Sequence, residues 1–366
     1  MVTRRSMAFI WAMAAVLAAC DGSAVATPPS GGPVDSAASP NPAAGSCVVG
    51  VSWADRIGHW GRWDEPAIKA AVAAGGGTYV SSDAGASETT QASDIDRLIA
   101  GGVRVLIILA QDASAIEAPI AAGHAHNIPV IVYDRLIDDP ATLYVSFDNV
   151  EVGRLQARAL LAAAPKGNYA FIKGDQGDAN SDLVRSGQEE VLADAVKSGA
   201  IRNVGETYTE NWDPDLAKAE TEAFLSKSAG ALDAVLSEND GMAGGVIAAL
   251  AGHKLTGKVA VSGEDGDAVA LNEVALGRQT VDVWKDARML GKAAGDAALE
   301  LCAGVTLHDL KGTTDYVTDT GHALTSILIT PVAVTRQNLS DVVEAGWIDK
   351  AVLCTGVPAA SVAACD

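Results

Sequence analysis

Indoles and planar polar side chains follow many of the apolar, β-branched runs of this sequence. Asp accepts hydrogen bonds through two oxygens, Arg donates through a fixed fork, and Asn does both, so this mixture suits a ring of hydroxyl groups. Trp60 and Trp212 could cover the two C–H faces of such a ring. The residues that we single out are His59, Trp60, Asp134, Arg135, Asn180, Arg185, Trp212, Asn239, Asp265 and Lys285. They favour a small neutral polyol over a phosphate or an apolar ligand.

Each of these residues also has a purely structural interpretation. Trp60 could pack against the edge of a sheet, Asp134-Arg135 could form a salt bridge within a loop, and Asn239 could satisfy a turn. Asp178 could serve only as a helix cap. Their shared location after predicted strands is the stronger part of the argument.

Sequence motifs for catalysis are missing from the chain. Residues 252–259 nearly spell a phosphate-binding loop, but Val259 stands where Ser or Thr is needed, and the stretch precedes a strand. No C-x-x-C, G-x-S-x-G or H-E-x-x-H occurs. We therefore expect no metal, no cofactor and no enzymatic activity. The enzyme alternative is an extracellular glycosidase, which needs two carboxylates about 5–9.5 Å apart; Asp134 and Asp265 are the candidates.

Strands and helices that could position these residues alternate along the chain. The predicted strands are Val48–Trp53, Thr78–Ser82, Val103–Leu109, Pro129–Tyr133, Tyr144–Phe147, Tyr169–Lys173, Arg202–Tyr208, Asp233–Leu236, Val259–Ser262 and Gln279–Trp284. The clearest predicted helices are Glu88–Ala100, the one that begins at Asp148-Asn149, and Asp286–Leu301. This alternation and the length of 366 residues predict two doubly wound parallel-sheet α/β domains. Ligands of such domains bind outside the carboxyl ends of the strands.

Charge and hydropathy exclude two classes of protein. The chain has 26 Lys and Arg residues against 46 Asp and Glu residues, a formal net charge of −20. Such a surface repels phosphate backbones, so we expect no nucleic-acid partner. No apolar run reaches the roughly 18–20 residues needed to span a bilayer.

The N-terminal segment has the features of an export signal and a tether. Residues 1–19 combine Arg4 and Arg5 with an apolar run, which is the layout of a secretory signal. The run ends in Leu-Ala-Ala-Cys20, which resembles the bacterial lipobox, although an ordinary signal peptide with an accidental Cys is the alternative. Residues 20–46 are rich in Ser, Pro, Gly and Ala and are expected to be a flexible linker. We expect a periplasmic or extracytoplasmic protein held at the membrane only by lipid on Cys20.

Four cysteines remain beyond this segment, namely Cys47, Cys302, Cys354 and Cys365. Disulfides are permitted outside the cytoplasm. Four cysteines allow three pairings, among which the spacing alone does not decide.

Several short stretches resemble the periplasmic sugar-binding proteins of ABC importers (type I periplasmic binding proteins), and within them the D-xylose-binding branch. They are residues 133–137 (YDRLI), 146–149 (SFDN), 165–169 (PKGNY), 185–188 (RSGQ), 239–245 (NDGMAGG), 257–259 (GKV) and 328–331 (LITP). The resemblance covers residues 48 to about 347. It implies that all the residues singled out above contact one monosaccharide, with His59 in a variant position. It also implies a monomer that delivers its sugar, D-xylose in particular, to an ABC permease. Another aldose, or a signalling ligand read by a sensor, is the alternative.

The resemblance further implies two lobes joined by a three-segment hinge, with the ligand in the cleft between them. The expected lobes are residues 47–146 plus 286–324 and residues 147–285 plus 325–366. In that arrangement Cys47 opens the first strand and Cys302 ends a helix that returns to the same end of the same lobe. We therefore expect a Cys47–Cys302 disulfide, and a Cys354–Cys365 disulfide that closes a short C-terminal loop.

Two positions depart from the family pattern. His59 stands where the family has Arg, and Glu264-Asp265 stands where Gln-Asp is common. With a reference pKa of about 6.5, His59 is expected to be mostly neutral at neutral pH and to supply only part of the donors of an Arg. Sugar affinity is then expected to change between about pH 5.5 and pH 7.5.

Overall fold

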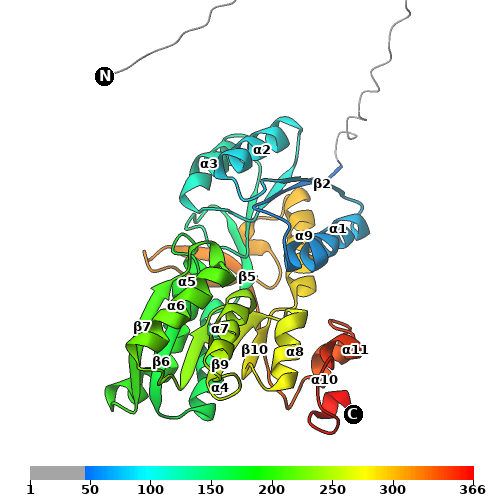
Figure 1. Ribbon diagram of the computed structural model, residues 1–366. Coiled ribbons are helices and arrows are strands. Elements are labelled where there is room, and N and C mark those ends of the chain that lie inside the picture. The colour runs from blue at the N-terminus through cyan, green and yellow to red at the C-terminus, as the bar shows by residue number, and fades with distance from the viewer. Residues whose placement is uncertain (1–45) are drawn as a thin grey trace, which may run out of the picture. The chain divides into compact units, whose positions relative to one another are not determined.

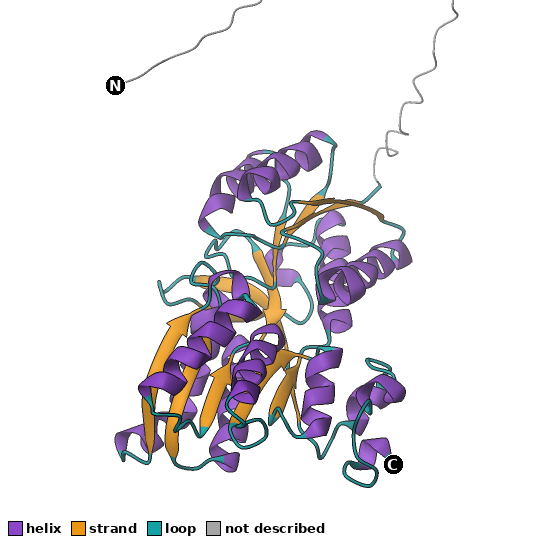
Figure 2. Ribbon diagram, in the orientation of Figure 1, coloured by secondary structure: helices purple, strands orange, loops and turns teal. Residues whose placement is uncertain are grey.

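The computed structural model describes residues 46–366. The predicted signal, Cys20 and the linker up to residue 45 lie outside the described residues. Within residues 46–366 the strands form two separate sheets, each flanked by helices (Figures 1 and 2).

The first sheet has seven strands. In spatial order they are β11 (Thr314–Val317), β12 (Ala323–Ile329), β5 (Leu143–Phe147), β4 (Val130–Tyr133), β3 (Val105–Ile108), β1 (Val48–Trp53) and β2 (Thr78–Asp83). All neighbours pair in parallel except the edge strand β11, which is antiparallel to β12. The helices α1 (Glu65–Ala74) and α9 (Ala287–Cys302) cover one face, and α2 (Glu88–Ala100) and α3 (Glu117–Ala125) cover the other.

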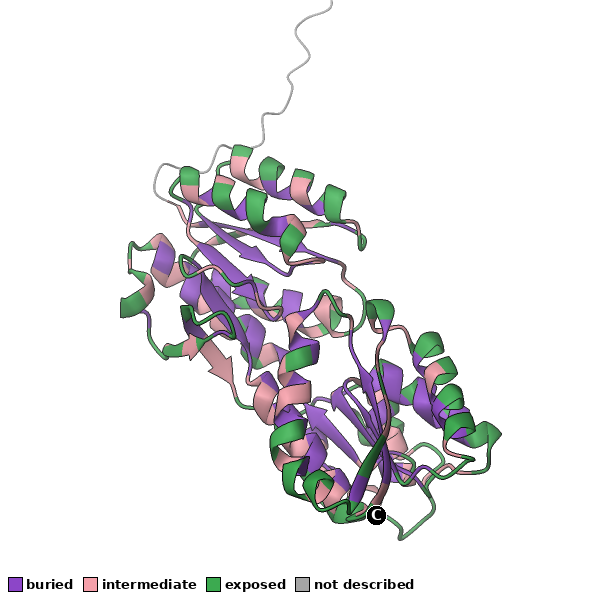
Figure 3. Ribbon diagram, turned by 90° about the vertical axis from the view of Figure 1, so that its left-hand side faces the viewer, coloured by how far each residue is buried: buried purple, intermediate pink, exposed green. Residues whose placement is uncertain are grey.

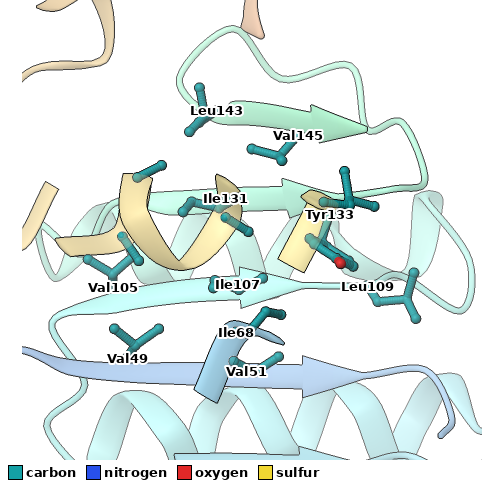
Figure 4. Packing of buried hydrophobic residues seen from close by; sticks show 14 of the residues in the cluster. Val49, Val51, Ile68, Val105, Ile107, Leu109, Ile131, Tyr133, Leu143 and Val145 are labelled. Carbon is teal, nitrogen blue, oxygen red and sulfur yellow. The ribbon is translucent and has the colours of Figure 1, made fainter. Parts of the chain in front are cut away.

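Apolar residues on both sides of the central strands explain this three-layer arrangement. In β3, Val105 and Ile107 join one buried cluster, while Leu106 and Ile108 join the other. Side chains alternate between the two faces of a strand, so a continuous apolar run buries both faces. Figure 4 shows the first cluster, in which Ile107 and its neighbours pack beside Ile68 of α1.

The second sheet has six strands and the same three layers. In spatial order they are β13 (Val332–Val334), β10 (Val281–Trp284), β9 (Ala260–Asp265), β8 (Ala234–Ser237), β6 (Gly167–Lys173) and β7 (Ile201–Tyr208), with β13 antiparallel to β10. The helices α6 (Pro214–Lys227) and α7 (Asp240–Gly252) share one buried cluster with the sheet, and α4 (Asn149–Ala163) and α5 (Ala179–Lys197) share another. The central strands of both sheets are buried, whereas edge strands such as β2, β7 and β11 and the outer faces of the helices are partly or fully exposed (Figure 3).

Shorter elements complete the fold. The helices α8 (Ala268–Leu276), α10 (Ser340–Glu344) and α11 (Lys350–Leu353) contribute to a further buried cluster. A π-helical turn spans Trp60–Asp64, and 3-10 turns span Ser114–Ile116, Glu210–Trp212, Leu307–Asp309 and Ala363–Cys365. None of the helices between residues 46 and 366 has the length and apolar character needed to cross a membrane.

The predicted fold class is confirmed, with corrections at its edges. All ten predicted strands form, but β11, β12 and β13 were not predicted, and the two antiparallel edge strands break the strictly parallel pattern. The chain passes between the two sheets after β5, after β10 and after β12. The third passage comes later than expected, because β12 remains in the first sheet to Ile329, beyond the expected limit at residue 324. The exact lobe limits otherwise stay predictions.

Both predicted disulfides are present. Cys47 and Cys302 lie 5.6 Å apart between their Cα atoms and join the start of β1 to the end of α9. Cys354 and Cys365, with Cα atoms 5.5 Å apart, close the C-terminal loop. The first disulfide thus ties a strand of the first sheet to a helix that covers it, and its two cysteines are separated by 255 positions in the chain.

Candidate functional site

A cavity of about 310 Å³ lies where strands of both sheets end. All the predicted contact residues except Arg185 line it. The first wall, as we call it, consists of the lining residues that follow β1 and β4, which are Asp55, Ile57, Gly58, His59, Trp60, Asp134 and Arg135. The second wall consists of Asp178, Asn180, Asn211, Trp212, Asn239, Gly241, Glu264, Asp265, Asp267 and Lys285. The rule that ligands bind outside the carboxyl ends of parallel strands, which we call the carboxyl-end rule, therefore located the pocket.

His59 and Trp60 are held by a buried network behind the first wall. His59 Nδ1 lies 2.8 Å from Asp64 Oδ2, and the Tyr133 hydroxyl donates to Asp64 Oδ1. Asp64 is fully buried, and the rings of His59 and Trp60 have centroids 3.8 Å apart. Asp64 ends the π-helical turn that begins at Trp60, and such turns are frequent at functional sites.

The protonation state expected for His59 is corrected by this network. Burial of the ring opposes its charge, but the Asp64 carboxylate and the hydrogen bond to it outweigh burial and raise the pKa of His59 to about 9. His59 is therefore cationic at neutral pH, as an Arg would be. With a pKa of about 9, His59 does not change its charge between pH 5.5 and pH 7.5. The sequence pattern gave a different expectation because it did not reveal that Asp64 would be buried beside the ring.

Asp134 and Asn180 meet across the two walls. Asn180 Nδ2 donates to Asp134 Oδ1 over 3.1 Å, and Arg135 Nε forms an ion pair with Asp178 Oδ2 over 3.0 Å. Arg135 also donates to the Ala110 carbonyl over 2.9 Å. Arg135 thus pairs with Asp178 and not with its neighbour Asp134, so the salt bridge expected within that loop is not the one that forms. Asp178 caps α5, as its structural interpretation holds, and both Arg135 and Asp178 line the cavity as well.

Strained backbone conformations gather at the cavity. The lining residues with left-handed backbone are Asp134 (φ 61°), Asn211 (φ 54°), Trp212 (φ 55°) and Asp265 (φ 110°). A non-Gly residue in such a conformation costs of order 1–3 kcal/mol, and such residues cluster where a side chain must be presented to a ligand. Their coincidence supports the assignment of this cavity as the functional site.

Trp212 depends on a glycine for its position. A Cβ atom on Gly174 would come within 2.1 Å of the Trp212 ring, so only glycine admits the indole there. Trp212 Nε1 is buried and has no hydrogen-bond partner among residues 46–366. Trp60 and Trp212 both line the cavity, but the sandwich of a sugar ring between them stays a prediction.

Lys285, Glu264 and Asp265 form a buried charged cluster in the second wall. Lys285 Nζ lies 3.1 Å from Glu264 Oε1 and 3.0 Å from Asp265 Oδ1. Burial raises the pKa of Glu264 to about 8 although Lys285 acts in the opposite direction. Burial would lower the pKa of Lys285, but Asp265 and Glu264 raise it well above its usual value. Glu264 is therefore mostly a neutral acid at pH 7, and its buried Oε2 has no partner within the described chain.

Of the predicted contacts Asn239 and Arg185, the first lines the cavity and the second does not. Asn239 lines the cavity and its Oδ1 also caps α7 by accepting from Met242 N over 2.9 Å. Arg185 lies outside the lining, so its role as a contact stays a prediction that the cavity does not support. Its Nε and Nη2 each lie 3.1 Å from a Glu206 oxygen, and its guanidinium stacks 4.2 Å above Phe171.

Several lining residues were not among the predicted contacts, and the ionisable ones are Asp55, Asp178, Glu264 and Asp267. Asp178 was interpreted as a cap, and Glu264 was noted only as a departure from the family pattern. Both follow or end predicted strands, so the carboxyl-end rule could have included them.

Comparisons with known proteins agree with this geometry. Residues 49–306 match the periplasmic binding protein domain family. The D-xylose-binding periplasmic protein of Escherichia coli strain K12 is 36% identical over 290 residues, covering 79% of this chain and 86% of that protein. The multiple sugar-binding periplasmic receptor ChvE of Rhizobium radiobacter is 30% identical, covering 71% of this chain and 79% of that protein.

A solved structure gives the same result at the level of the fold. An ABC transporter solute binding protein from Clostridium phytofermentans with bound β-D-glucose superposes with a TM-score of 0.74 at 25% identity, covering 84% of this chain and 99% of that one. With a family match over most of the described residues and a relative at 36% identity, the chain belongs to the periplasmic binding protein family.

Proposed function

We propose that this chain captures a monosaccharide outside the cytoplasmic membrane and delivers it to an ABC importer, with D-xylose as the favoured ligand. The observation that carries the proposal is the convergence of two indoles with Asp, Asn, Arg and Lys side chains in one cavity at the strand ends. D-xylose is favoured because the relative at 36% identity is a D-xylose-binding protein. The relatives also include a multiple sugar-binding receptor, so another aldose is the second candidate.

The charges of the cavity favour a neutral ligand. The carboxyl groups of five aspartates and Glu264 line it, against the cationic groups of His59, Arg135 and Lys285. A phosphate or carboxylate on the ligand would therefore meet an excess of acidic groups. A sugar hydroxyl can donate to one such group and accept from a cation at the same time.

Binding would act through the two sheets and not through chemistry on the ligand. The cavity takes residues from both sheets, and the chain passes between them three times. A ligand that contacts both walls stabilises whichever arrangement brings the walls together, and a permease can recognise that arrangement. In this proposal lipid on Cys20 keeps the protein at the membrane and no bond of the sugar is broken.

Calorimetric titration with a panel of neutral sugars tests the proposal. The panel is D-xylose, D-ribose, L-arabinose, D-glucose and D-galactose, with D-glucuronate as the anionic control. We expect D-xylose to bind most tightly and D-glucuronate not to bind. Tighter binding of another aldose would replace the ligand, and no binding of any sugar would overturn the function.

Three variants test the enclosing indoles. Trp60→Ala and Trp212→Ala should each weaken D-xylose binding by at least about tenfold, since each removes one apolar face. Gly174→Ala should weaken it as well, because the added methyl displaces the Trp212 ring and leaves the indole itself intact. Unchanged affinity in both Trp variants would remove the sandwich.

A further inference from the structure

Asp64 lies behind the pocket and does not line it, yet it determines what the first wall offers to a ligand. Its two oxygens are both engaged, one by His59 Nδ1 and the other by the Tyr133 hydroxyl. Tyr133 is itself fully buried, with its ring 6.0 Å from that of Trp53. The carboxylate is thus fixed in position by the core of the first sheet.

The contact to Asp64 fixes which ring nitrogen of His59 remains for a ligand. Because the carboxylate accepts the proton of Nδ1, only Nε2 is left, and it has no hydrogen-bond partner in the part of the chain that the structure describes. A neutral ring in this orientation would present Nε2 as an acceptor. An imidazolium presents it as a donor. The charge of His59 therefore decides the polarity of this contact.

The groups around His59 favour the imidazolium. The ionisable groups whose charges act on it or respond to it are Asp64 on its own element, Asp134 after β4, Asp265 and Asp267 at the end of β9, and Lys285 after β10. Four carboxyl groups thus interact with the ring against one ammonium. Burial raises the pKa of Asp64, Asp134 and Asp267, and the charge of His59 acts to lower the pKa of each of them. The cation is stabilised by this excess, and most strongly by Asp64 at 2.8 Å.

A donor at this point also suits a pocket that is rich in carboxylates. A sugar hydroxyl has one proton to donate, and it can give that proton either to a carboxylate or to a neutral imidazole, but not to both. If Nε2 donates, the hydroxyl proton stays free for a carboxylate such as Asp134 or Asp265. We propose that Asp64 is a positioning residue that holds His59 as an imidazolium, so that Nε2 donates to a ligand oxygen. This inference rests on the proposed sugar-binding function.

The variant Asp64→Asn tests the role of the charge, since it keeps the size of the side chain. In the wild type, loss of the His59 proton should weaken D-xylose binding only as the pH passes about 9. Glu264 ionises near pH 8 in both proteins, so the variant is compared with the wild type at each pH. In the variant the His59 pKa should return to about 6.5 or below. Affinity should then be near the wild-type value at about pH 5.5 and at least about tenfold weaker by pH 8.

The matched control is Asp139→Asn, which removes a carboxylate from beside another histidine. Asp139 Oδ2 lies 3.2 Å from His124 Nε2, and neither residue lines the sugar pocket. This variant should keep the wild-type affinity across the whole pH range. If Asp64→Asn loses affinity equally at every pH, or follows the wild-type profile, the positioning role of Asp64 is wrong.

Titration of the His59 ring by NMR in the ligand-free protein separates this inference from the proposed function. The resonance is assigned with His59→Ala, and we expect a midpoint near pH 9 in the wild type and near or below about pH 6.5 in Asp64→Asn. A ring that is neutral at pH 7 in the wild type overturns the inference whether or not sugar binds. If the His59 ring is charged but the protein binds no sugar, the effect of Asp64 on the protonation of His59 stands, and only the proposed sugar-binding function is overturned.

Discussion

The two walls of the pocket both bury charge, but they balance it differently. Behind the first wall Asp64 contacts one potential cation, His59, and both of its oxygens have partners. In the second wall one ammonium, Lys285, is shared by Glu264 and Asp265, and Glu264 Oε2 has no partner among the described residues. The first arrangement is a closed support, whereas the second leaves a polar atom available to a ligand.

The ratio of acids to cations decides where the extra proton resides. Opposite His59, the carboxylate raises the pKa of the ring to about 9, so the base keeps its proton. Around Lys285 a single ammonium cannot neutralise two buried carboxylates, and burial raises the pKa of Glu264 to about 8. Similar side chains thus yield a cation in one wall and a neutral acid in the other.

The largest expected effect is that of Lys285→Met, which removes the only cation of the shared cluster. It should abolish sugar binding and lower the free energy of unfolding at neutral pH by about 3–5 kcal/mol, because two buried carboxyl groups lose their partner. Urea unfolding and calorimetry provide the measurements. Lys311→Met is the control, since its side chain is 89% exposed and lies 3.5 Å from Glu300. It should change stability by less than about 1 kcal/mol. Equal effects of the two variants would contradict the description of the cluster.

Glu264→Gln should have a smaller effect, and one that depends on pH. The folded chain holds the Glu264 proton up to about pH 8, whereas the unfolded chain releases it near 4.5. The stability that this group contributes is therefore fully present below the unfolded pKa and is lost as the pH rises through the folded one. The variant does not titrate, so its free energy of unfolding should exceed the wild-type value by a margin that grows between about pH 5 and pH 8.

Urea unfolding at a series of pH values measures this margin, and Glu344→Gln on the exposed side of α10 is the control. Sugar affinity at pH 7 should survive in Glu264→Gln, because a neutral acid is replaced by a neutral amide of the same shape. A margin that is constant with pH would show that Glu264 is ionised in the folded protein.

The smallest effect on binding is expected for Arg185→Met. The Arg185 side chain pairs with Glu206 and stacks on Phe171 outside the pocket. Sugar affinity should therefore change by less than about twofold, while the protein becomes less stable through the loss of this pairing. Calorimetry on the variant distinguishes a structural role of Arg185 from a role as a sugar contact. A loss of affinity as large as that of Trp212→Ala would show that Arg185 contacts the sugar.

Position along the chain explains why Asn180 lines the cavity and Arg185 does not. Asn180 lies in the first turn of α5, directly outside the carboxyl end of β6. Arg185 lies five residues further on, about 7–8 Å along the helix axis, where it meets Glu206 of β7. The carboxyl-end rule applies to the loop and the first helical turn after a strand, and it does not predict pocket residues further along the helix.

The edge strands β11 and β13 were not predicted, and the reason is a different one. β11 is mostly exposed, and β13 has three residues. Edge strands of this kind carry neither a long apolar run nor a clean alternation, so the sequence contains little signal for them. β11 becomes a strand by pairing with β12, which follows it directly, and β13 by pairing with β10 from much earlier in the chain.

The sequence by itself determined the α/β class, the two sheets and the chemical types gathered in the pocket. It could do so because strand and helix periodicities are local, and because parallel strands bring their carboxyl ends to one edge. Only the tertiary structure decided the charge on the pocket residues. A pKa depends on burial and on nearby charges from any part of the chain. His59 meets Asp64 under the hydroxyl of Tyr133, and Glu264 shares Lys285 with its neighbour. His59 and Asp64 stand only five positions apart, and Glu264 and Lys285 lie in and directly after neighbouring strands of one sheet. The burial that sets their charges exists only once each sheet has packed against its helices, so spacing along the chain does not reveal that the histidine is charged and the glutamate neutral.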